Sequence, residues 1–280
     1  MSYFKIKSYA KVNLALNVVG KSKSLHLIES IISFLDLHDE IKIKKIKAKN
    51  HKISFLGKFS YGIKSKNTIS QLLEYIDKKK LLKNKYQIVI KKNVPSMAGL
   101  GGGSMNAASI INFFVKKKLI KVNKKEIIEI SNSIGSDVKL GIYSKNLIVK
   151  ASNSIKTFSF KKKFYTLVVK PNFGCSTKKI YSKVKKFTIS KYNNPKKIMF
   201  SQKYLSIQEN HLENVVFSIY PKLKELKNFL LKNDNLSFVR MTGSGSVLVA
   251  YFQSKQDCEI AKVRLKRKFK KYWCNTAKTI

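Results

Sequence analysis

A glycine-rich segment lies at residues 95–108, between an expected strand and an expected helix. It reads PSMAGLGGGSMNAA, so four glycines stand within five consecutive residues. Glycine has no Cβ atom, which lets backbone N–H groups approach an anion closely. The first turn of the following helix adds unpaired N–H donors and a partial positive charge. The segment therefore predicts a phosphate-binding loop, in which Ser104 offers a hydroxyl to phosphate or Mg²⁺. The alternative is a tight turn that binds no ligand.

Two well-known phosphate-binding motifs do not fit this loop. A Walker A loop needs Lys after its last glycine, whereas Gly103 is followed by Ser104 and Met105. A dinucleotide-binding fingerprint needs glycine at both ends, whereas the stretch that starts at Gly99 ends at Ser104. The loop therefore indicates a nucleotide site of a different kind.

Polar residues elsewhere in the chain have plain structural interpretations when they are taken alone. Asp137 is one of only 15 acidic residues and follows an expected helix end, which is typical of a capping or turn aspartate. Lys11 is one of 55 lysines, and an ordinary strand-surface lysine is the default interpretation. Asn13, two residues later, shares its face of the strand. His26 is one of four histidines, and a lone histidine is most often structural or exposed.

The chemistry-bearing residues must be positioned by a mixture of strands and helices. Alternating apolar residues predict strands at 2–20, within 40–56 and at 86–91, and further strands at 146–170, 236–241 and 246–252. Helical spacing predicts helices at 67–82, after the glycines, and at 212–232 and 255–270. Asn123 is expected to cap a further helix, which Gly135 would stop. The polar, lysine-rich residues 187–203 are expected to form a turn or loop. Strands and helices do not alternate strictly, so an α+β fold is expected. The length of 280 residues allows two domains, predicted at 1–155 and 156–280.

The net charge of +43 is the most unusual property of the composition. Of the 58 basic residues only three are arginine, and the chain also holds 30 Ile and 21 Asn. A/T-rich codons encode Lys, Ile and Asn, whereas selection for phosphate recognition favours the planar fork of Arg. A diffuse, solvated positive surface is therefore expected, with no specific nucleic-acid partner. The alternative is a basic RNA-binding protein, whose basic or aromatic residues would gather in one stripe.

The composition also bears on the compartment. Three cysteines are too few for a disulfide scaffold, and their spacing fits no zinc site. No apolar run approaches the roughly 20 residues that span a bilayer. A cytoplasmic location without a membrane partner is therefore expected.

The glycine loop, together with other segments in their order along the chain, resembles the GHMP kinase superfamily of small-molecule kinases. The closest resemblance is to the branch that acts on 4-diphosphocytidyl-2-C-methyl-D-erythritol in the methylerythritol phosphate route to isoprenoid precursors. The similar segments lie at 9–14, 25–30, 95–108, 135–138, 171–177 and 241–246. The resemblance implies a fold of two α+β domains. The N-terminal domain would be like domain 2 of ribosomal protein S5, and the C-terminal domain would be ferredoxin-like.

The resemblance also implies the reaction, which is ATP-dependent phosphorylation of the acceptor's 2-hydroxyl with Mg²⁺. Asp137 would be the catalytic base, and Lys11 would stabilise the transferred phosphoryl group. Asn13 and His26 would bind the substrate. The ATP-binding residues would be Pro95, Ser96, Met97, Ala98, Gly99, Leu100, Gly101, Gly102, Gly103, Ser104 and Met105.

The chain departs from the family pattern at the base-binding segment. Leu25 precedes His26 where the family carries a tyrosine that stacks on cytosine. This departure keeps another GHMP kinase activity open, such as one that acts on homoserine or mevalonate.

Overall fold

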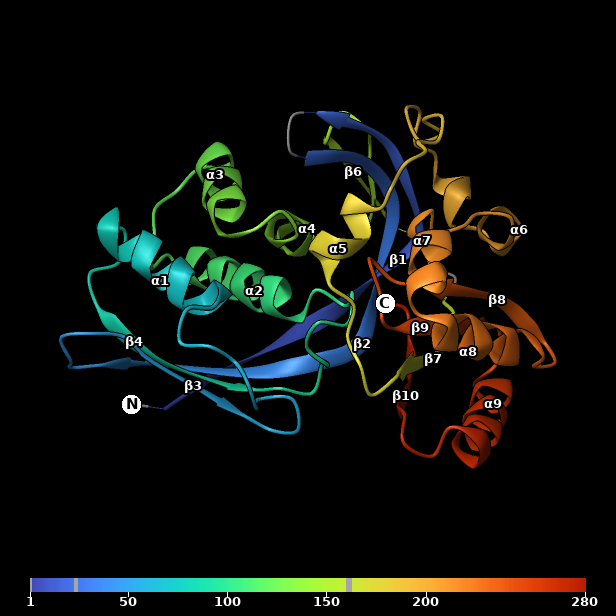
Figure 1. Cartoon of the computed structure of the whole chain (residues 1–280). Coiled ribbons are helices and arrows are strands. Elements are labelled where there is room, and N and C mark those ends of the chain that lie inside the picture. The colour runs from blue at the N-terminus through green and yellow to red at the C-terminus, as the bar shows by residue number, and fades with distance from the viewer. Residues whose placement is uncertain (1, 23–24, 160–162) are drawn as a thin grey trace. The chain divides into compact units, whose positions relative to one another are not determined.

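The computed structural model describes residues 2–22, 25–159 and 163–280 (Figure 1). The chain forms two compact units, each built from several segments. Unit 1 comprises residues 1–11, 37–96 and 101–144, and unit 2 comprises residues 12–36, 97–100 and 145–280. Two long strands run from one unit into the other, β1 (Phe4–Ser22) and β2 (Leu25–Ile46), and they pair with each other. The sequence pattern predicted the first of these strands but only the last third of β2, from residue 40 to 46.

Unit 1 is a sheet covered by helices. The end of β2 pairs antiparallel with β4 (Lys85–Lys91), which pairs in parallel with β3 (Lys52–Leu56). Figure 1 shows α1 (Thr68–Lys78) and α2 (Gly102–Lys116) above these strands. Helices α3 (Lys124–Ile134) and α4 (Val138–Tyr143) complete the unit. One apolar cluster joins alternate residues of β2 and β4 to the inward faces of α1, α2 and α3.

The ends of the helices in unit 1 follow from the local sequence. The Asn67 side chain caps α1, and the Asn123 side chain caps α3 in a reciprocal capping box with Glu126. The predicted cap at Asn123 and the predicted stop at Gly135 are therefore confirmed. This stop leaves a short segment between α3 and α4, in which Asp137 lies.

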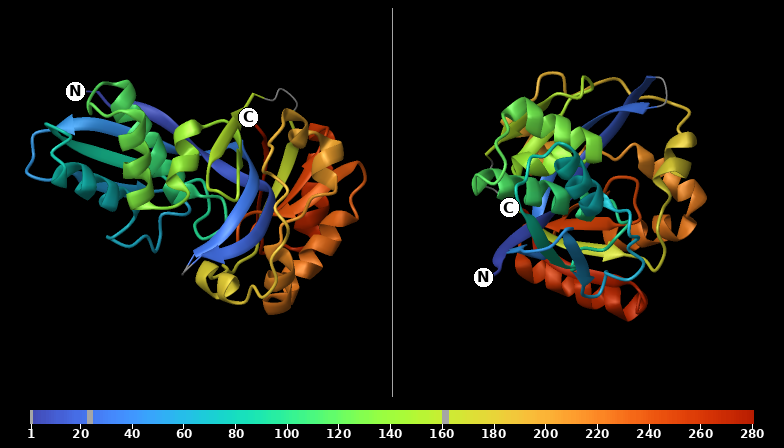
Figure 2. Two further views of the ribbon diagram at one scale, coloured as in Figure 1. Left: turned by 90° about the horizontal axis from the view of Figure 1, so that it is seen from above. Right: turned by 90° about the vertical axis from the view of Figure 1, so that its left-hand side faces the viewer.

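Unit 2 contains a four-stranded antiparallel sheet in the order β10-β7-β9-β8. Its strands are β7 (Tyr165–Lys170), β8 (Leu236–Met241), β9 (Leu248–Phe252) and β10 (Trp273–Lys278). Helices α7 (Leu212–Ile219), α8 (Pro221–Leu231) and α9 (Lys255–Lys268) share one apolar cluster with it, and Figure 2 shows these orange and red helices beside the strands. The first half of β2 pairs with β5 (Asn146–Val149), which pairs with β6 (Ile155–Phe158). Shorter helices are α5 (Thr177–Ser182), α6 (Gln202–Ser206) and a 3-10 turn at Lys197–Phe200.

The α+β class is confirmed, and two details of the prediction are corrected. The predicted helix over 212–232 is two helices, because Pro221 starts a new helix at its first position. The predicted loop at 187–203 contains the 3-10 turn and the start of α6. Each compact unit is built from three segments, and the segments of the two units alternate along the chain. The predicted single domain boundary near residue 155 stays a proposal. Among the helices in the described ranges, none is both long and apolar enough to cross a membrane.

Candidate active site

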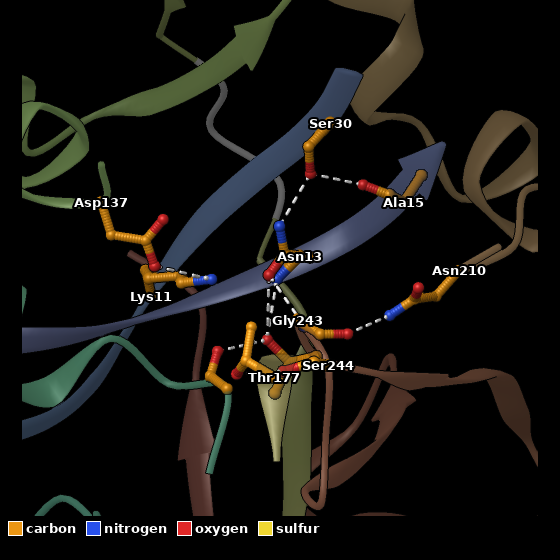
Figure 3. Close-up of polar contacts among 11 residues, drawn as sticks. Lys11, Asn13, Ala15, Ser30, Asp137, Thr177, Asn210, Gly243 and Ser244 are labelled. Carbon is orange, nitrogen blue, oxygen red and sulfur yellow. Dashed lines mark hydrogen bonds and ion pairs between the residues drawn. The ribbon is translucent and has the colours of Figure 1, made fainter. Parts of the chain in front are cut away.

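Unit 1 brings together Lys11 and Asp137, which are far apart in the sequence. The Lys11 ammonium lies 3.5 Å from a carboxylate oxygen of Asp137 (Figure 3). The lysine side chain is 5% exposed and the aspartate side chain 39%, so a buried cation holds a carboxylate that solvent can reach. In such a pair the carboxylate can accept a proton from a bound ligand, and the ammonium can stabilise negative charge on it.

Asp137 occupies the N-cap position of α4, but its side chain makes no capping hydrogen bond. Its backbone carbonyl accepts from the N–H of Leu140 at 3.1 Å, so the backbone alone starts the helix. The capping interpretation of Asp137 is therefore wrong for the side chain. The carboxylate points instead toward Lys11.

The glycine loop leads directly to the same lysine. Gly101 precedes α2 in the left-handed region at φ 68°, where other residues are strained. A Cβ atom on Gly101 would lie 2.9 Å from Cγ of Lys11, so only glycine lets the loop pass this close to the lysine. The first turn of α2, with Ser104, thus starts beside the Lys11–Asp137 pair within unit 1. A helix N-terminus next to a cation favours an anionic ligand.

A buried aspartate that the sequence analysis missed fixes the base of this loop. The Asp39 carboxylate is fully buried and accepts from the N–H groups of Asn93 at 2.7 Å and Val94 at 2.8 Å. It also forms an ion pair with Lys92 and accepts from the Asn106 amide at 3.0 Å. Asp39 therefore ties the end of β4 to α2 on either side of the loop. The scarcity of acidic residues was the only sequence signal that could have found it.

Unit 2 holds the other predicted residues, and Asn13 lies at the centre of a hydrogen-bond network there (Figure 3). Its side-chain amide donates to the Ser30 hydroxyl at 2.8 Å, and its carbonyl oxygen accepts from the N–H of Gly243 at 3.0 Å. Its backbone N–H donates to the Thr242 hydroxyl at 3.1 Å. Asn13 is 3% exposed, so this side chain anchors the turn after β8.

The middle of the predicted ATP loop, residues 97–100, belongs to unit 2 and touches the same turn. The Thr242 hydroxyl donates to the carbonyl of Gly99 at 3.0 Å. A Cβ atom on Gly99 would lie 2.0 Å from the carbonyl oxygen of Thr242, and its φ is 72°. Gly99 is therefore required by the packing of the loop against this turn, whereas the motif predicted glycines that make room for phosphate.

His26, also in unit 2, is partly buried and lies among aromatic rings. Its ring centroid is 5.1 Å from that of Tyr181 and 6.3 Å from that of Phe187. Burial, followed by the nearby charge of Lys21, lowers the pKa of His26 below its usual value. The imidazole is therefore neutral at pH 7 and can both donate and accept a hydrogen bond. The side chain of Leu25 lies outside the described residues.

Comparison with known proteins identifies the family. The description "GHMP kinases N terminal domain" matches residues 67–145, and "GHMP kinases C terminal" matches residues 191–271. The chain is 55% identical to the 4-diphosphocytidyl-2-C-methyl-D-erythritol kinase of Pelagibacter ubique over 281 residues, covering 100% of both chains. It is 32% identical to the kinase of the same name from Clostridium tetani, covering 95% of this chain and 96% of that one.

Solved structures share the fold. A crystal structure of 4-(cytidine 5'-diphospho)-2C-methyl-D-erythritol kinase matches with a TM-score of 0.79 at 20% identity, over 98% of this chain and 99% of that one. Homoserine kinase from Cytophaga hutchinsonii matches with a TM-score of 0.72 at 14% identity, over 100% of this chain and 95% of that one. At these identities the likeness concerns the fold alone. Together with the full-length sequence relatives, the matches show that this chain belongs to the GHMP kinases, in the family of the 4-diphosphocytidyl-2-C-methyl-D-erythritol kinases.

Proposed function

We propose that this protein transfers the γ-phosphoryl group of ATP to the 2-hydroxyl of 4-diphosphocytidyl-2-C-methyl-D-erythritol. The observation that carries the chemistry is the Lys11–Asp137 pair beside the N-terminus of α2, all within unit 1. The acceptor is proposed from the 55% identical relative, whose name states it.

Phosphoryl transfer asks the protein mainly to position the reactants and to stabilise charge. In our proposal the Asp137 carboxylate orients the acceptor hydroxyl and takes its proton as the new P–O bond forms. The Lys11 ammonium stabilises the negative charge that develops on the transferred group. The burial of Lys11 strengthens this effect, because less solvent screens its charge.

The family uses ATP, and we propose that residues 95–105 bind its phosphates. Mg²⁺ would enter as part of the MgATP substrate. It prefers oxygen ligands and usually binds through substrate phosphates with one or two carboxylates, so it needs no protein cage. Within the described ranges, no group of three His, Cys, Asp or Glu residues could hold a metal ion. Ser104, in the first turn of α2, would supply a hydroxyl to the phosphates or to Mg²⁺.

We propose that the cytosine ring is recognised in unit 2. The neutral His26 imidazole can hydrogen-bond a base edge, and Tyr181 beside it offers an aromatic face for stacking. In this proposal Tyr181 supplies the stacking surface that Leu25 cannot. Asn13 would position the neighbouring turn after β8 next to the substrate.

The test is a coupled ADP-release assay with MgATP and three acceptors, the cytidylyl alcohol, homoserine and mevalonate. We expect kcat/KM for the cytidylyl alcohol to exceed that for the other two by at least about 10³-fold, since buried polar groups left unpaired penalise the wrong acceptor. Turnover of homoserine or mevalonate, with none of the cytidylyl alcohol, would assign the protein to a sister activity and overturn the proposal.

A further inference from the structure

A buried carboxylate joins the two ends of the proposed nucleotide loop. Asp39, on β2, is 0% exposed, and it lies in unit 1 together with both ends of the loop. The chain enters the loop at residues 92–96, just after β4, and leaves it on the first turns of α2. The proposed reaction gives Asp39 no role of its own, so its place at this junction needs another explanation.

The hydrogen bonds of Asp39 reach both ends of the loop. Its Oδ1 accepts from the backbone N–H groups of Asn93 at 2.7 Å and Val94 at 2.8 Å, just before Pro95. Its Oδ2 accepts from the side-chain amide of Asn106 at 3.0 Å, in the second turn of α2. One side chain therefore fixes the point where the chain enters the loop relative to the helix on which it leaves.

The same Oδ2 atom also holds a buried cation. It forms an ion pair with the ammonium of Lys92, whose side chain is 4% exposed. A Cβ atom on Gly102, the first residue of α2, would lie 3.2 Å from this ammonium, so the cation lies against the first turn of the helix. A cation at the positive end of a helix dipole is unfavourable by itself. The charge of Asp39 offsets this and keeps Lys92 in place.

Stability alone does not account for this arrangement. Removing both charges of an ion pair from water costs free energy that their attraction offsets only in part, and apolar residues of similar volume often stabilise a fold as well. A carboxylate has about four acceptor sites, two on each oxygen. Two donors approach each oxygen of Asp39, so the network defines one geometry for the ends of the loop.

We propose that Asp39 is a positioning residue for nucleotide binding, whose carboxylate holds both ends of the loop in the arrangement that receives the phosphates of ATP. This inference rests on the proposed function, because it takes residues 95–105 to bind these phosphates. A glycine-rich loop loses much conformational freedom when it becomes ordered. Fixed ends reduce the freedom that is left to lose on binding, which raises affinity. Asp39 thus acts on ATP affinity without touching either substrate.

The variant that tests this role is Asp39→Asn. It keeps the size of the side chain and an oxygen for the N–H groups of Asn93 and Val94. It also removes the charge and turns an NH2 group toward two donors, Lys92 and Asn106. We expect the Kd of MgATP to rise about 10- to 100-fold, the loss typical of residues that orient the ligands of a bound group. The KM for ATP should rise in parallel, whereas kcat at saturating ATP and the KM for the acceptor stay unchanged.

The matched control is Asp77→Asn. Asp77, on α1, pairs with Lys85 at the start of β4, which is the end of this strand away from the loop. The exchange removes the same charge from the same unit and should leave the Kd of MgATP unchanged. Calorimetric titration of MgATP, well below the melting temperature of each variant, gives the Kd values, and circular dichroism confirms that each variant is folded.

A second variant, Asn106→Ala, keeps the inference testable if Asp39→Asn does not fold. It removes the hydrogen bond to α2 and leaves the ion pair of Asp39 with Lys92 in place. We expect it to raise the Kd of MgATP as well, by less than Asp39→Asn does. The double variant should bind MgATP little more weakly than Asp39→Asn alone, because both changes interrupt one link and their effects are not additive.

An Asp39→Asn protein that binds MgATP as tightly as Asp77→Asn contradicts the inference, and so does an Asn106→Ala protein with wild-type affinity. Losses of kcat and of acceptor affinity as large as the loss of ATP affinity would also overturn it, because they indicate general damage to the fold. A wild-type protein that does not bind MgATP would instead refute the proposed function, so the two failures are distinguishable.

Discussion

At the scale of single residues, the two proposed catalytic groups differ in how far the sequence identifies them. Lys11 has no sequence property that separates it from 54 other lysines, and only the motif around it points to a role. Asp137 is conspicuous because acids are scarce, but its default interpretation as a cap is wrong for the side chain. Their proximity depends on the path of β1 through unit 1, which no local pattern contains.

We expect Asp137→Asn to lower kcat by about 10²–10⁴-fold, the usual contribution of a general base. The exchange keeps the size of the side chain and removes the charge and the proton acceptor. ATP binding should persist, because the loop and not this carboxylate is proposed to hold the phosphates. Steady-state kinetics combined with calorimetric ATP titration separates the two effects. Near-normal kcat in this variant would remove Asp137 from the role of base.

Lys11→Met should also lower kcat, because it removes the cation aimed at the developing charge. The double variant with Asp137→Asn should be little worse than the worse single variant, since residues that act as a unit are not additive. Steady-state kinetics on the two single variants and the double variant gives the coupling free energy between the two residues. Fully multiplicative losses would mean that the two residues act independently.

The base-recognition residues could be predicted only in part, since His26 belongs to a motif whereas Tyr181 lies 155 positions away. Tyr181→Leu removes the aromatic face beside His26 and keeps an apolar side chain. Stacking on a base is worth about 1–3 kcal/mol, so KM for the cytidylyl alcohol should rise about 5- to 150-fold with KM for ATP unchanged. Initial rates at varied acceptor and ATP give both constants. An unchanged acceptor KM would show that the cytosine is held elsewhere.

At the scale of secondary-structure elements, local patterns predicted most helices and strands, and long-range contacts decided the rest. The Asn123 cap and the Gly135 stop are local signals, and the helix between them appears as predicted. Strand β10 was missed because its sequence, WCNTAK, alternates weakly, and it is held by pairing with β7 over 100 residues earlier. The length of β2 was likewise underestimated, because the part before residue 40 is specified by pairing with β1 and β5.

The glycine loop shows the same division between local and long-range causes. The motif predicted glycines that make room for phosphate, yet Gly99 is needed for the approach of Thr242 and Gly101 for that of Lys11. Gly102 also faces protein, because its Cβ atom would lie 3.2 Å from the Lys92 ammonium and 3.3 Å from Val94. A branched residue at Gly102 would therefore perturb the packing of the loop before it met a ligand.

We expect Gly99→Ala to destabilise the protein by more than Gly62→Ala does. Both glycines have φ values above 70°, so both changes strain the backbone, which costs of order 1 kcal/mol. A Cβ atom on Gly62 meets nothing within 4 Å, whereas one on Gly99 would overlap the Thr242 carbonyl. The difference in free energy of unfolding, measured by urea denaturation, isolates the clash. Equal losses of unfolding free energy in the two variants would mean that the close contact between Gly99 and Thr242 does not contribute to stability.

At the scale of the whole molecule, the net charge of +43 is the property that the fold does not explain. The composition predicts a diffuse charge with no specific nucleic-acid partner, and this stays a prediction. The interleaved units likewise could not be read from the sequence, since β1 and β2 each serve both units. Self-repulsion of so many like charges should destabilise the compact state at low ionic strength.

We therefore expect the melting temperature to rise between 10 and 200 mM NaCl, about the range over which the screening length falls from roughly 30 Å to below 10 Å. RNA should bind weakly at physiological salt, without sequence preference, and dissociate steeply as salt increases. Differential scanning fluorimetry and fluorescence anisotropy measure the two effects. A salt-resistant complex with one RNA sequence would favour the nucleic-acid alternative.

The central claim, phosphorylation of the 2-hydroxyl by MgATP, is tested most directly by the proton-coupled ³¹P spectrum of the product. The 2-carbon of a 2-C-methyl erythritol bears no hydrogen, so a phosphate on its oxygen has no proton three bonds away. We predict that incubation of the enzyme with MgATP and 4-diphosphocytidyl-2-C-methyl-D-erythritol gives ADP and a new phosphomonoester signal that is a singlet. A triplet, from a phosphate on the 1-hydroxyl, a doublet, from one on the 3-hydroxyl, or no new phosphomonoester at all would contradict it.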